Sequence, residues 1–127
     1  MKIIKFNEHL EQKKIFIICS VRGMDKNYID KLIHYAEQLE SMGHEVYLPP
    51  RDTDQSLGGL DINKSNREGI RNADEIHLFY NPKSSGTHFD LGQAFAFKKP
   101  IKIIEEIKLP TGSVYNNTIN EWEKLGP

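Results

Sequence analysis

The sequence predicts an α/β fold, a three-layer sandwich in which helices cover both faces of a mostly parallel sheet of four to five strands. One observation and one general rule carry this prediction. Short apolar segments alternate with amphipathic, helix-like segments four times along the chain, and parallel neighbours in a sheet need helical crossovers between them. The chain has 127 residues, so we expect a single domain spanning 1–127.

Four segments are expected to form strands: 13–20, 45–50, 74–80 and 100–106. The first, KKIFIICS, is a continuous apolar run typical of a strand buried on both faces. The second ends at two prolines, which cannot continue a sheet. The N-terminal residues 1–13, which include MKIIKF, are a candidate edge strand or arm.

Three helices are expected between the strands. The first begins at Asp25, a good N-cap, and ends at Gly43. The second covers 60–73 with Asp61 as its cap, and the third covers 87–99. The polar, Gly-rich segment 51–59 is expected to be a mobile loop. The tail 108–127 is expected to be irregular, with a short helix at NTINEWEKLG.

Composition narrows the functional classes. Formal net charge is −1 and no long run of Lys or Arg occurs, whereas binding to a nucleic-acid backbone needs clustered positive charge. The longest apolar runs are strand-sized and too short to cross a bilayer. The single cysteine, Cys19, fits a reducing compartment. We therefore expect a cytoplasmic protein that binds neither nucleic acid nor membrane.

In parallel α/β sheets, ligands bind at the carboxyl ends of the strands. The loops to consider are therefore 19–25, 49–60 and 80–88. In the first, Ser20, Arg22 and Gly23 stand between a strand and a helix N-terminus, where free N–H groups and an Arg suit an anion. A tight turn with an exposed Arg explains the same residues equally well.

Asn66 interrupts an otherwise apolar helix face formed with Ile62, Ile70 and Ala73. A polar side chain buried on such a face needs a partner, which can be a ligand or a neighbouring backbone group.

The stretch SSGTHFDLGQAF (84–95) leads from a small-residue turn into the third helix. Asp90 stands three residues after Thr87, which is close to the capping-box pattern. Asp90 also shares an inward face with Thr87 and Ala94, so it can instead be a reactive carboxylate. The pattern alone leaves these two interpretations equal.

No metal site and no cofactor are expected. The five histidines show no ligand spacing with Cys or carboxylates. Cys19 is expected to be a buried core thiol without an activating neighbour.

Three segments together resemble the nucleoside 2-deoxyribosyltransferase superfamily, and within it the 2′-deoxynucleoside 5′-phosphate N-hydrolase branch. They are IFIICSVRGMDKNYIDKLIHYAEQLESMGHEVYLP, NREGIRNADEIHLFYNPKSSGTHFDLGQAFAFKKPIKII and GSVYNN. The similarity runs from about Ile15 to Ile119. It implies a flavodoxin-like or Rossmann-like fold, usually assembled as a homodimer, that cleaves the N-glycosidic bond of a nucleoside or nucleoside 5′-monophosphate by hydrolysis or transfer.

The resemblance also implies residue roles. Asp90 takes the position of the carboxylate that attacks the anomeric carbon, and Asn66 that of an acid which assists proton transfer. Ser20, Arg22 and Gly23 match the loop that lines the nucleotide site. Ser84, within the same turn as Gly86, matches a contact to the 5′-phosphate. Asn116 matches a residue that the partner subunit donates.

Two positions depart from the family pattern. Asp90 replaces a Glu that is one methylene longer, and Asn66 replaces an acid although an amide exchanges no proton at neutral pH. The leading hypothesis is therefore a glycosidase or transferase, and the alternative is a nucleotide-binding or sensing module that keeps the cleft without turnover. A pure interaction protein and a flavin carrier of the same fold are weaker hypotheses.

Overall fold

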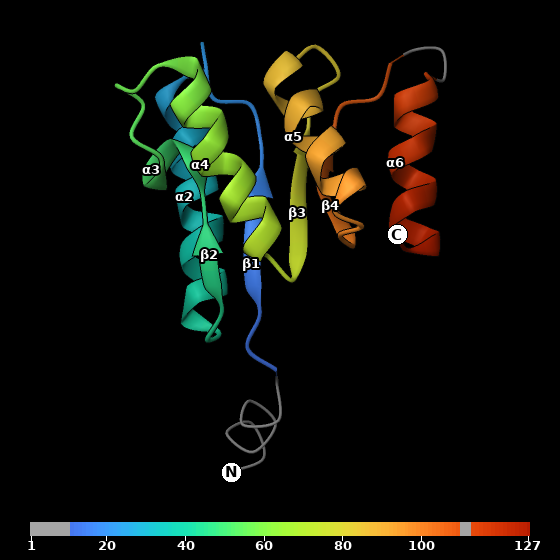
Figure 1. Ribbon diagram of the computed structural model, residues 1–127, viewed down its shortest axis with the longest axis horizontal. Coiled ribbons are helices and arrows are strands. Elements are labelled where there is room, and N and C mark those ends of the chain that lie inside the picture. The colour runs from blue at the N-terminus through green and yellow to red at the C-terminus, as the bar shows by residue number, and fades with distance from the viewer. Residues whose placement is uncertain (1–10, 110–112) are drawn as a thin grey trace.

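The computed structural model describes residues 11–109 and 113–127. Its strands are β1 (Lys14–Ile18), β2 (Glu45–Tyr47), β3 (Glu75–Tyr80) and β4 (Ile101–Glu106). They form one sheet in the order β2-β1-β3-β4, and each neighbouring pair is parallel. The α/β class and the four predicted strands are therefore confirmed (Figure 1). The possible strand at MKIIKF lies outside the described residues.

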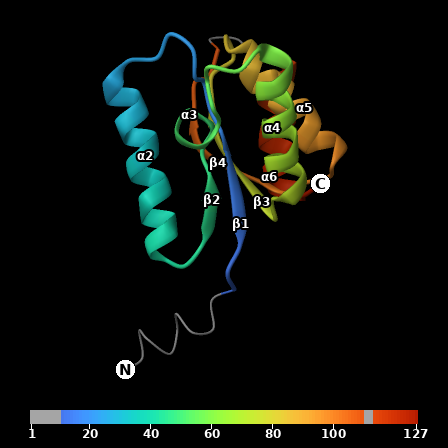
Figure 2. The ribbon, with the colours of Figure 1, turned by 60° about the vertical axis from the view of Figure 1, so that its left-hand side comes forward.

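The helices form two layers around this sheet. They are α2 (Lys26–Ser41), α3 (Pro49–Asp52), α4 (Gly59–Asn72), α5 (Ser85–Ala96) and α6 (Val114–Leu125). Figure 2 shows α2 on one face and α4, α5 and α6 on the other. Because every strand runs in the same direction, these four long helices begin at the edge where the strands end (Figure 1).

Alternate residues of the central strands build a core on each face. Ile15 and Ile17 of β1 pack with α2, whereas Phe16 and Ile18 pack with α4, α5 and α6. Burial on both faces explains why β1 reads as a continuous apolar run instead of an alternating one.

Three local predictions differ from the structure. The two prolines do not end a strand but begin the short helix α3, because proline suits the first helical turn. Helix α4 begins after Gly58, and Asp61 lies in its first turn without capping it. The tail forms a longer helix, α6, because the Ser113 side chain accepts a hydrogen bond from Asn116 N–H and caps it.

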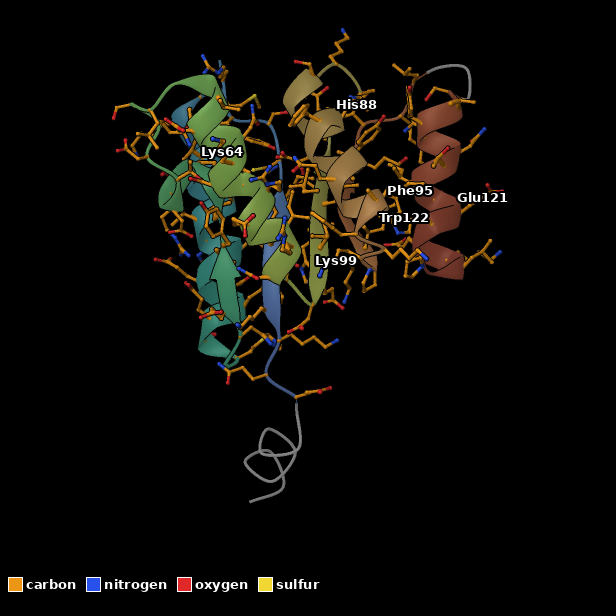
Figure 3. The ribbon with its side chains drawn as sticks, in the orientation of Figure 1. Lys64, His88, Phe95, Lys99, Glu121 and Trp122 are labelled. Atoms are coloured by element: carbon orange, nitrogen blue, oxygen red, sulfur yellow. The ribbon has the colours of Figure 1, made fainter. Side chains whose placement is uncertain are left out.

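Two contacts of Trp122 attach α6 to the rest of the domain. The Trp122 indole N–H donates to Lys99 O at 2.9 Å, just before β4. Its ring meets Phe95 of α5 edge-on, with 5.3 Å between centroids. Figure 3 labels both residues, between α5 and α6. The Lys99 ammonium in turn donates to the carbonyls of Arg71 and Ala73 at the end of α4. No helix in the described part of the chain is long and apolar enough to span a membrane.

Gly69 sets how closely α4 approaches β1. A Cβ at this position would lie 2.8 Å from two ring carbons of Phe16 and 3.4 Å from the Tyr47 ring. Phe16 is fully buried, so its ring has little room to move. Any larger side chain at Gly69 would push α4 away from the sheet.

We predict that Gly69→Ala destabilises the protein by about 1–3 kcal/mol, because the added methyl overpacks a buried aromatic contact. The matched control is Gly92→Ala in α5, where a Cβ would meet no atom of the described residues within 4 Å. It should stabilise the protein by about 0.5–1 kcal/mol, the ordinary gain of Ala over Gly in a helix. Urea unfolding measures both changes, and equal effects at the two positions would contradict this account of the α4 packing.

Candidate active site

A pocket of about 410 Å³ opens at the carboxyl edge of the sheet. The ends of β1 and β3 form its floor, and the first turns of α4 and α5 form its walls. Its lining residues are Cys19, Ser20, Val21, Arg22, Met24, Pro49, Gln55, Gly59, Ile62, Asn63, Asn66, Asn81, Lys83, Ser84, Ser85, Gly86 and Asp90. The structure thus brings together residues from all three loops that the sequence singles out.

Asp90 does not cap α5. The cap is Ser84, whose Oγ accepts a hydrogen bond from Thr87 N–H at 3.2 Å. Because that N–H is already used, the capping-box interpretation of Thr87 and Asp90 is excluded. Asp90 instead lies in the second turn, only 7% exposed, and lines the pocket. No described residue donates a hydrogen bond to its carboxylate, and none forms an ion pair with it.

The pKa of Asp90 reflects this burial. Loss of water around the carboxylate raises its pKa from the ordinary 3.8 to about 7. The group is therefore divided between its neutral and ionised forms near neutral pH. A carboxyl with a pKa near the working pH is the type of group that exchanges protons or attacks carbon in an active site.

Cys19 lies beside this carboxylate but is chemically quiet. Burial, and next the charge of Asp90, raise the pKa of its thiol to about 12. At neutral pH the sulfur remains protonated and is a poor nucleophile. The expectation of a buried core thiol is confirmed.

Asn66 is buried on the inner face of α4, as its apolar neighbours predicted, and lines the same pocket. Its partner is a side chain that the sequence did not indicate. Thr53 Oγ1 donates to Asn66 Oδ1 at 2.9 Å. Tyr47 Oη lies 2.7 Å from Thr53 Oγ1, which extends the chain of hydrogen bonds to the end of β2.

The loop after β1 contributes Ser20 and Arg22 to the pocket lining. Ser20 is 4% exposed, and its Oγ has no hydrogen-bond partner among the residues that the structure describes. A buried hydroxyl without a partner costs stability and is typical of a site that a ligand completes. Gly23 does not line the pocket. It forms the turn instead, with a φ of 73° that side-chain-bearing residues rarely adopt.

The opposite wall is the start of α5. Ser84, Ser85 and Gly86 line the pocket here, at the positive end of the helix dipole. Lys83 and Arg22 add positive charge, and Asp90 is the only carboxylate among the lining residues. Asp90 lies deep in the pocket and the cations lie at its rim, where they are exposed. The rim therefore suits an anionic group.

Asn116 is not part of this pocket. Its amide Nδ2 donates to Glu106 Oε2 at 2.8 Å, and Ser113 Oγ donates to its Oδ1 at 2.7 Å. The side chain is buried within its own chain. The structure therefore does not bring Asn116 to the other predicted site residues.

Sequence reasoning missed several lining residues: Met24, Gln55, Asn63, Asn81 and Lys83. For all of them except Asn63, which lies in α4, the signal was their place in the three loops. Asn63 precedes Asn66 by one helical step and shares its side of α4. The others are ordinary loop residues in type, so only the fold shows that they meet.

Among the described residues, no group of three or more His, Cys, Asp or Glu side chains could hold a metal ion.

Comparisons of the sequence with models of protein families and with curated proteins found no match. Solved structures do resemble this chain. The CMP N-glycosidase BcmB of Clostridium botulinum is 20% identical, with a TM-score of 0.61 over 84% of this chain and 80% of its own. The 2-deoxyribosyltransferase of Bacillus psychrosaccharolyticus is 20% identical over the same shares, with a TM-score of 0.62.

A third structure, the solution structure of BlsM, is 25% identical. It matches over 72% of this chain and 63% of its own, with a TM-score of 0.60. The chain shares their fold. With it, the flavodoxin-like three-layer arrangement expected from the sequence is confirmed.

We predict that Asp90→Asn makes the protein more stable above neutral pH. The native carboxyl binds its proton more tightly than the unfolded one, so its stabilising contribution is complete below about pH 4 and is lost as pH rises through about 7. The amide carries no charge to bury. Its stability relative to wild type should therefore increase between about pH 4 and about pH 7 and stay level above that, by at most about 4 kcal/mol over the whole range.

Urea unfolding of both proteins across this pH range measures the difference in free energy of unfolding. A difference that stays constant with pH would show that Asp90 ionises as an ordinary exposed carboxylate does.

Proposed function

We propose that this protein cleaves the N-glycosidic bond of a nucleoside or nucleoside 5′-monophosphate, with Asp90 as the nucleophile. The observation that carries the proposal is the buried Asp90 carboxylate, which does not cap α5 and lines a pocket together with Asn66 and Ser20. The resemblance in sequence to nucleoside 2-deoxyribosyltransferases supports it. So does a fold shared with structures described as a CMP N-glycosidase and a 2-deoxyribosyltransferase.

The proposed reaction has two steps. An Asp90 oxygen bonds to the anomeric carbon while the bond from that carbon to the base nitrogen breaks, and the base leaves with the electron pair and takes a proton from water. Water, or a second base, then attacks the same carbon, breaks the bond from that carbon to the Asp90 oxygen and gives up a proton to the hydroxide left by the first step, which restores the Asp90 carboxylate. Asn66 exchanges no proton, and its role is to donate a hydrogen bond to the bound nucleoside.

The charge arrangement supports a nucleotide ligand. The exposed Arg22 and Lys83 at the rim and the N-terminus of α5 suit a phosphate. Ser84 is expected to contact it through its backbone or hydroxyl, although that hydroxyl already accepts the bond from Thr87. Asp90, deeper in the pocket, would then face the sugar.

A non-catalytic nucleotide-binding module is the second candidate, and two features favour it. Asn66 removes the acid–base partner, while a pKa of about 7 leaves part of Asp90 protonated at neutral pH. Such a module would bind a nucleotide tightly and leave it intact over hours.

The test is release of free base from a panel of nucleosides and nucleoside 5′-monophosphates, followed by chromatography. We expect release by the wild type and a loss of at least about a thousandfold in Asp90→Asn. Nucleophilic attack needs the carboxylate, so kcat/KM should fall about tenfold for each pH unit below about 7 and be constant above it.

Tight binding without release identifies the binding module. If neither binding nor release occurs with any compound of the panel, the proposed function is wrong.

We further propose that the protein forms a homodimer through the groove between α5 and α6. This groove has a volume of about 770 Å³ and is lined by mostly apolar residues, among them Phe95 and Tyr115, which are 62% and 61% exposed. Lys83 and Ser85 line both this groove and the candidate active site. A second copy seated here would therefore stand next to the substrate.

Light scattering after size exclusion tests the dimer. We expect a dimeric wild type and a monomeric Phe95→Glu, because the added charge would be buried in the interface. The matched control is Phe89→Glu, an exposed Phe of the same helix that does not line the groove. A monomeric wild type, or equal effects of the two substitutions, would rule out this interface.

A further inference from the structure

We propose that Thr53 is a positioning residue that determines which end of the Asn66 carboxamide faces the ligand. It holds the amide oxygen away from the pocket, so that Asn66 presents its NH₂ group to a hydrogen-bond acceptor of the bound nucleoside. The proposal rests on the function proposed above and adds a requirement on the ligand: an acceptor atom at this point.

The order of the hydrogen bonds follows from counting protons. The Thr53 hydroxyl has one proton, and it donates that proton to Asn66 Oδ1 at 2.9 Å. The contact of 2.7 Å between Tyr47 Oη and Thr53 Oγ1 must then use the Tyr47 proton. The chain runs in one direction, from Tyr47 to Thr53 to Asn66, and each donor strengthens the next.

Thr53 is held firmly enough to impose this order. It is 5% exposed and ends α3, where its N–H donates to Pro49 O at 3.0 Å. The Gln55 side-chain amide donates to Pro49 O at 3.0 Å and to Thr53 O at 3.3 Å, which closes the turn around it. The segment after β2 therefore connects β2 to α4 and also holds the Thr53 hydroxyl in place.

Tyr47 and Asn66, the other two residues in this series of hydrogen bonds, are held in place as well. The Tyr47 ring stacks on Phe16 with 5.2 Å between centroids and 15° between planes. Asn66 is brought to Thr53 by the close approach of α4 to the sheet, which Gly69 permits three residues later. A half-turn of the carboxamide would break the bond from Thr53 to Asn66 Oδ1, and a contact from Asn66 Nδ2 could replace it only if the Thr53 hydroxyl turned its proton toward Tyr47.

The free end of the amide faces the ligand. Asn66 lines the pocket, whereas Thr53 does not. No described residue accepts a hydrogen bond from Asn66 Nδ2, so its two N–H groups remain available. The pocket therefore offers a donor at this depth, in contrast to a carboxylate at the same position, which would offer only acceptors.

The experiment compares Thr53→Val, which keeps the shape and removes the hydroxyl, with Thr53→Ser, which keeps the hydroxyl. The first readout needs no ligand: the side-chain amide signals of Asn66 in ¹⁵N-labelled protein, assigned by their loss in Asn66→Asp. We expect them to shift and to exchange faster with solvent in Thr53→Val and to return toward wild type in Thr53→Ser.

The second readout is function, measured as kcat, KM and the Kd for a 2′-deoxynucleoside 5′-monophosphate. Thr53→Val should weaken ligand binding about tenfold, as expected for one lost hydrogen bond to the ligand, and Thr53→Ser should restore it. Tyr47→Phe keeps the stacking on Phe16 and removes only the first donor, so a smaller loss is expected. If Thr53→Val does not fold, the same measurements are made on Tyr47→Phe instead.

Unchanged amide signals and unchanged affinity in Thr53→Val would overturn the proposal, as would a Thr53→Ser variant that behaves as Thr53→Val does. A wild type that binds no nucleoside or nucleotide overturns the proposed function and the ligand half of this inference. The amide signals still decide, independently, whether Thr53 orients Asn66.

Discussion

One hydrogen bond at the start of α5 determines what Asp90 can do. Because Ser84 accepts the Thr87 N–H, the helix has its cap before its first turn is complete. A helix capped by Thr87 would use Asp90 to close a capping box, and the carboxylate would then be occupied by backbone. With Ser84 as the cap, Asp90 is one turn further in, where the inner face of the helix meets the end of the sheet.

Parallel strands turn this local arrangement into a site. The carboxyl ends of β1 and β3 and the first turns of α4 and α5 converge at one edge, so an apolar core lies below the pocket and helix N-termini surround it. The same edge contains buried polar groups that are unusual in an apolar core, and two of them line the pocket. One is the Asp90 carboxylate, and the other is the Ser20 hydroxyl, which has no partner in the described part of the chain. Features that lower stability without a structural gain are typical of functional sites.

Much of the fold could be predicted from the sequence, because the spacing of apolar residues indicates which face of a strand or helix is buried. The run IFII gave β1, and the spacing of Ile62, Asn66 and Ile70 gave the inner face of α4. Helix ends were less predictable, since Asp61, Thr87 and their neighbours all resemble caps and only tertiary packing selects among them. The two prolines read as a strand end because their helix, α3, is a single turn.

Some residues of the candidate site could also be predicted from the sequence, and others could not. Ser20, Arg22, Asn66, Ser84, Gly86 and Asp90 follow strands or face inward on helices, and the structure brings them to one pocket. Thr53 could not be foreseen, because it lies in a segment that reads as a loop and is placed by contacts with β2 and α4. Asn116 was assigned by resemblance alone, and in its own chain it bonds to Glu106 and Ser113.

The central claim is that Asp90 bonds to the sugar, and the stereochemistry of the product tests it most directly. The reaction of a β-configured 2′-deoxynucleoside 5′-monophosphate can be run with methanol as a competing acceptor. The product is then a methyl glycoside, whose α and β forms do not interconvert in solution. Two displacements at one carbon restore the original configuration, so the account predicts the β-methyl glycoside. The α-methyl glycoside, from a single direct displacement, would contradict it.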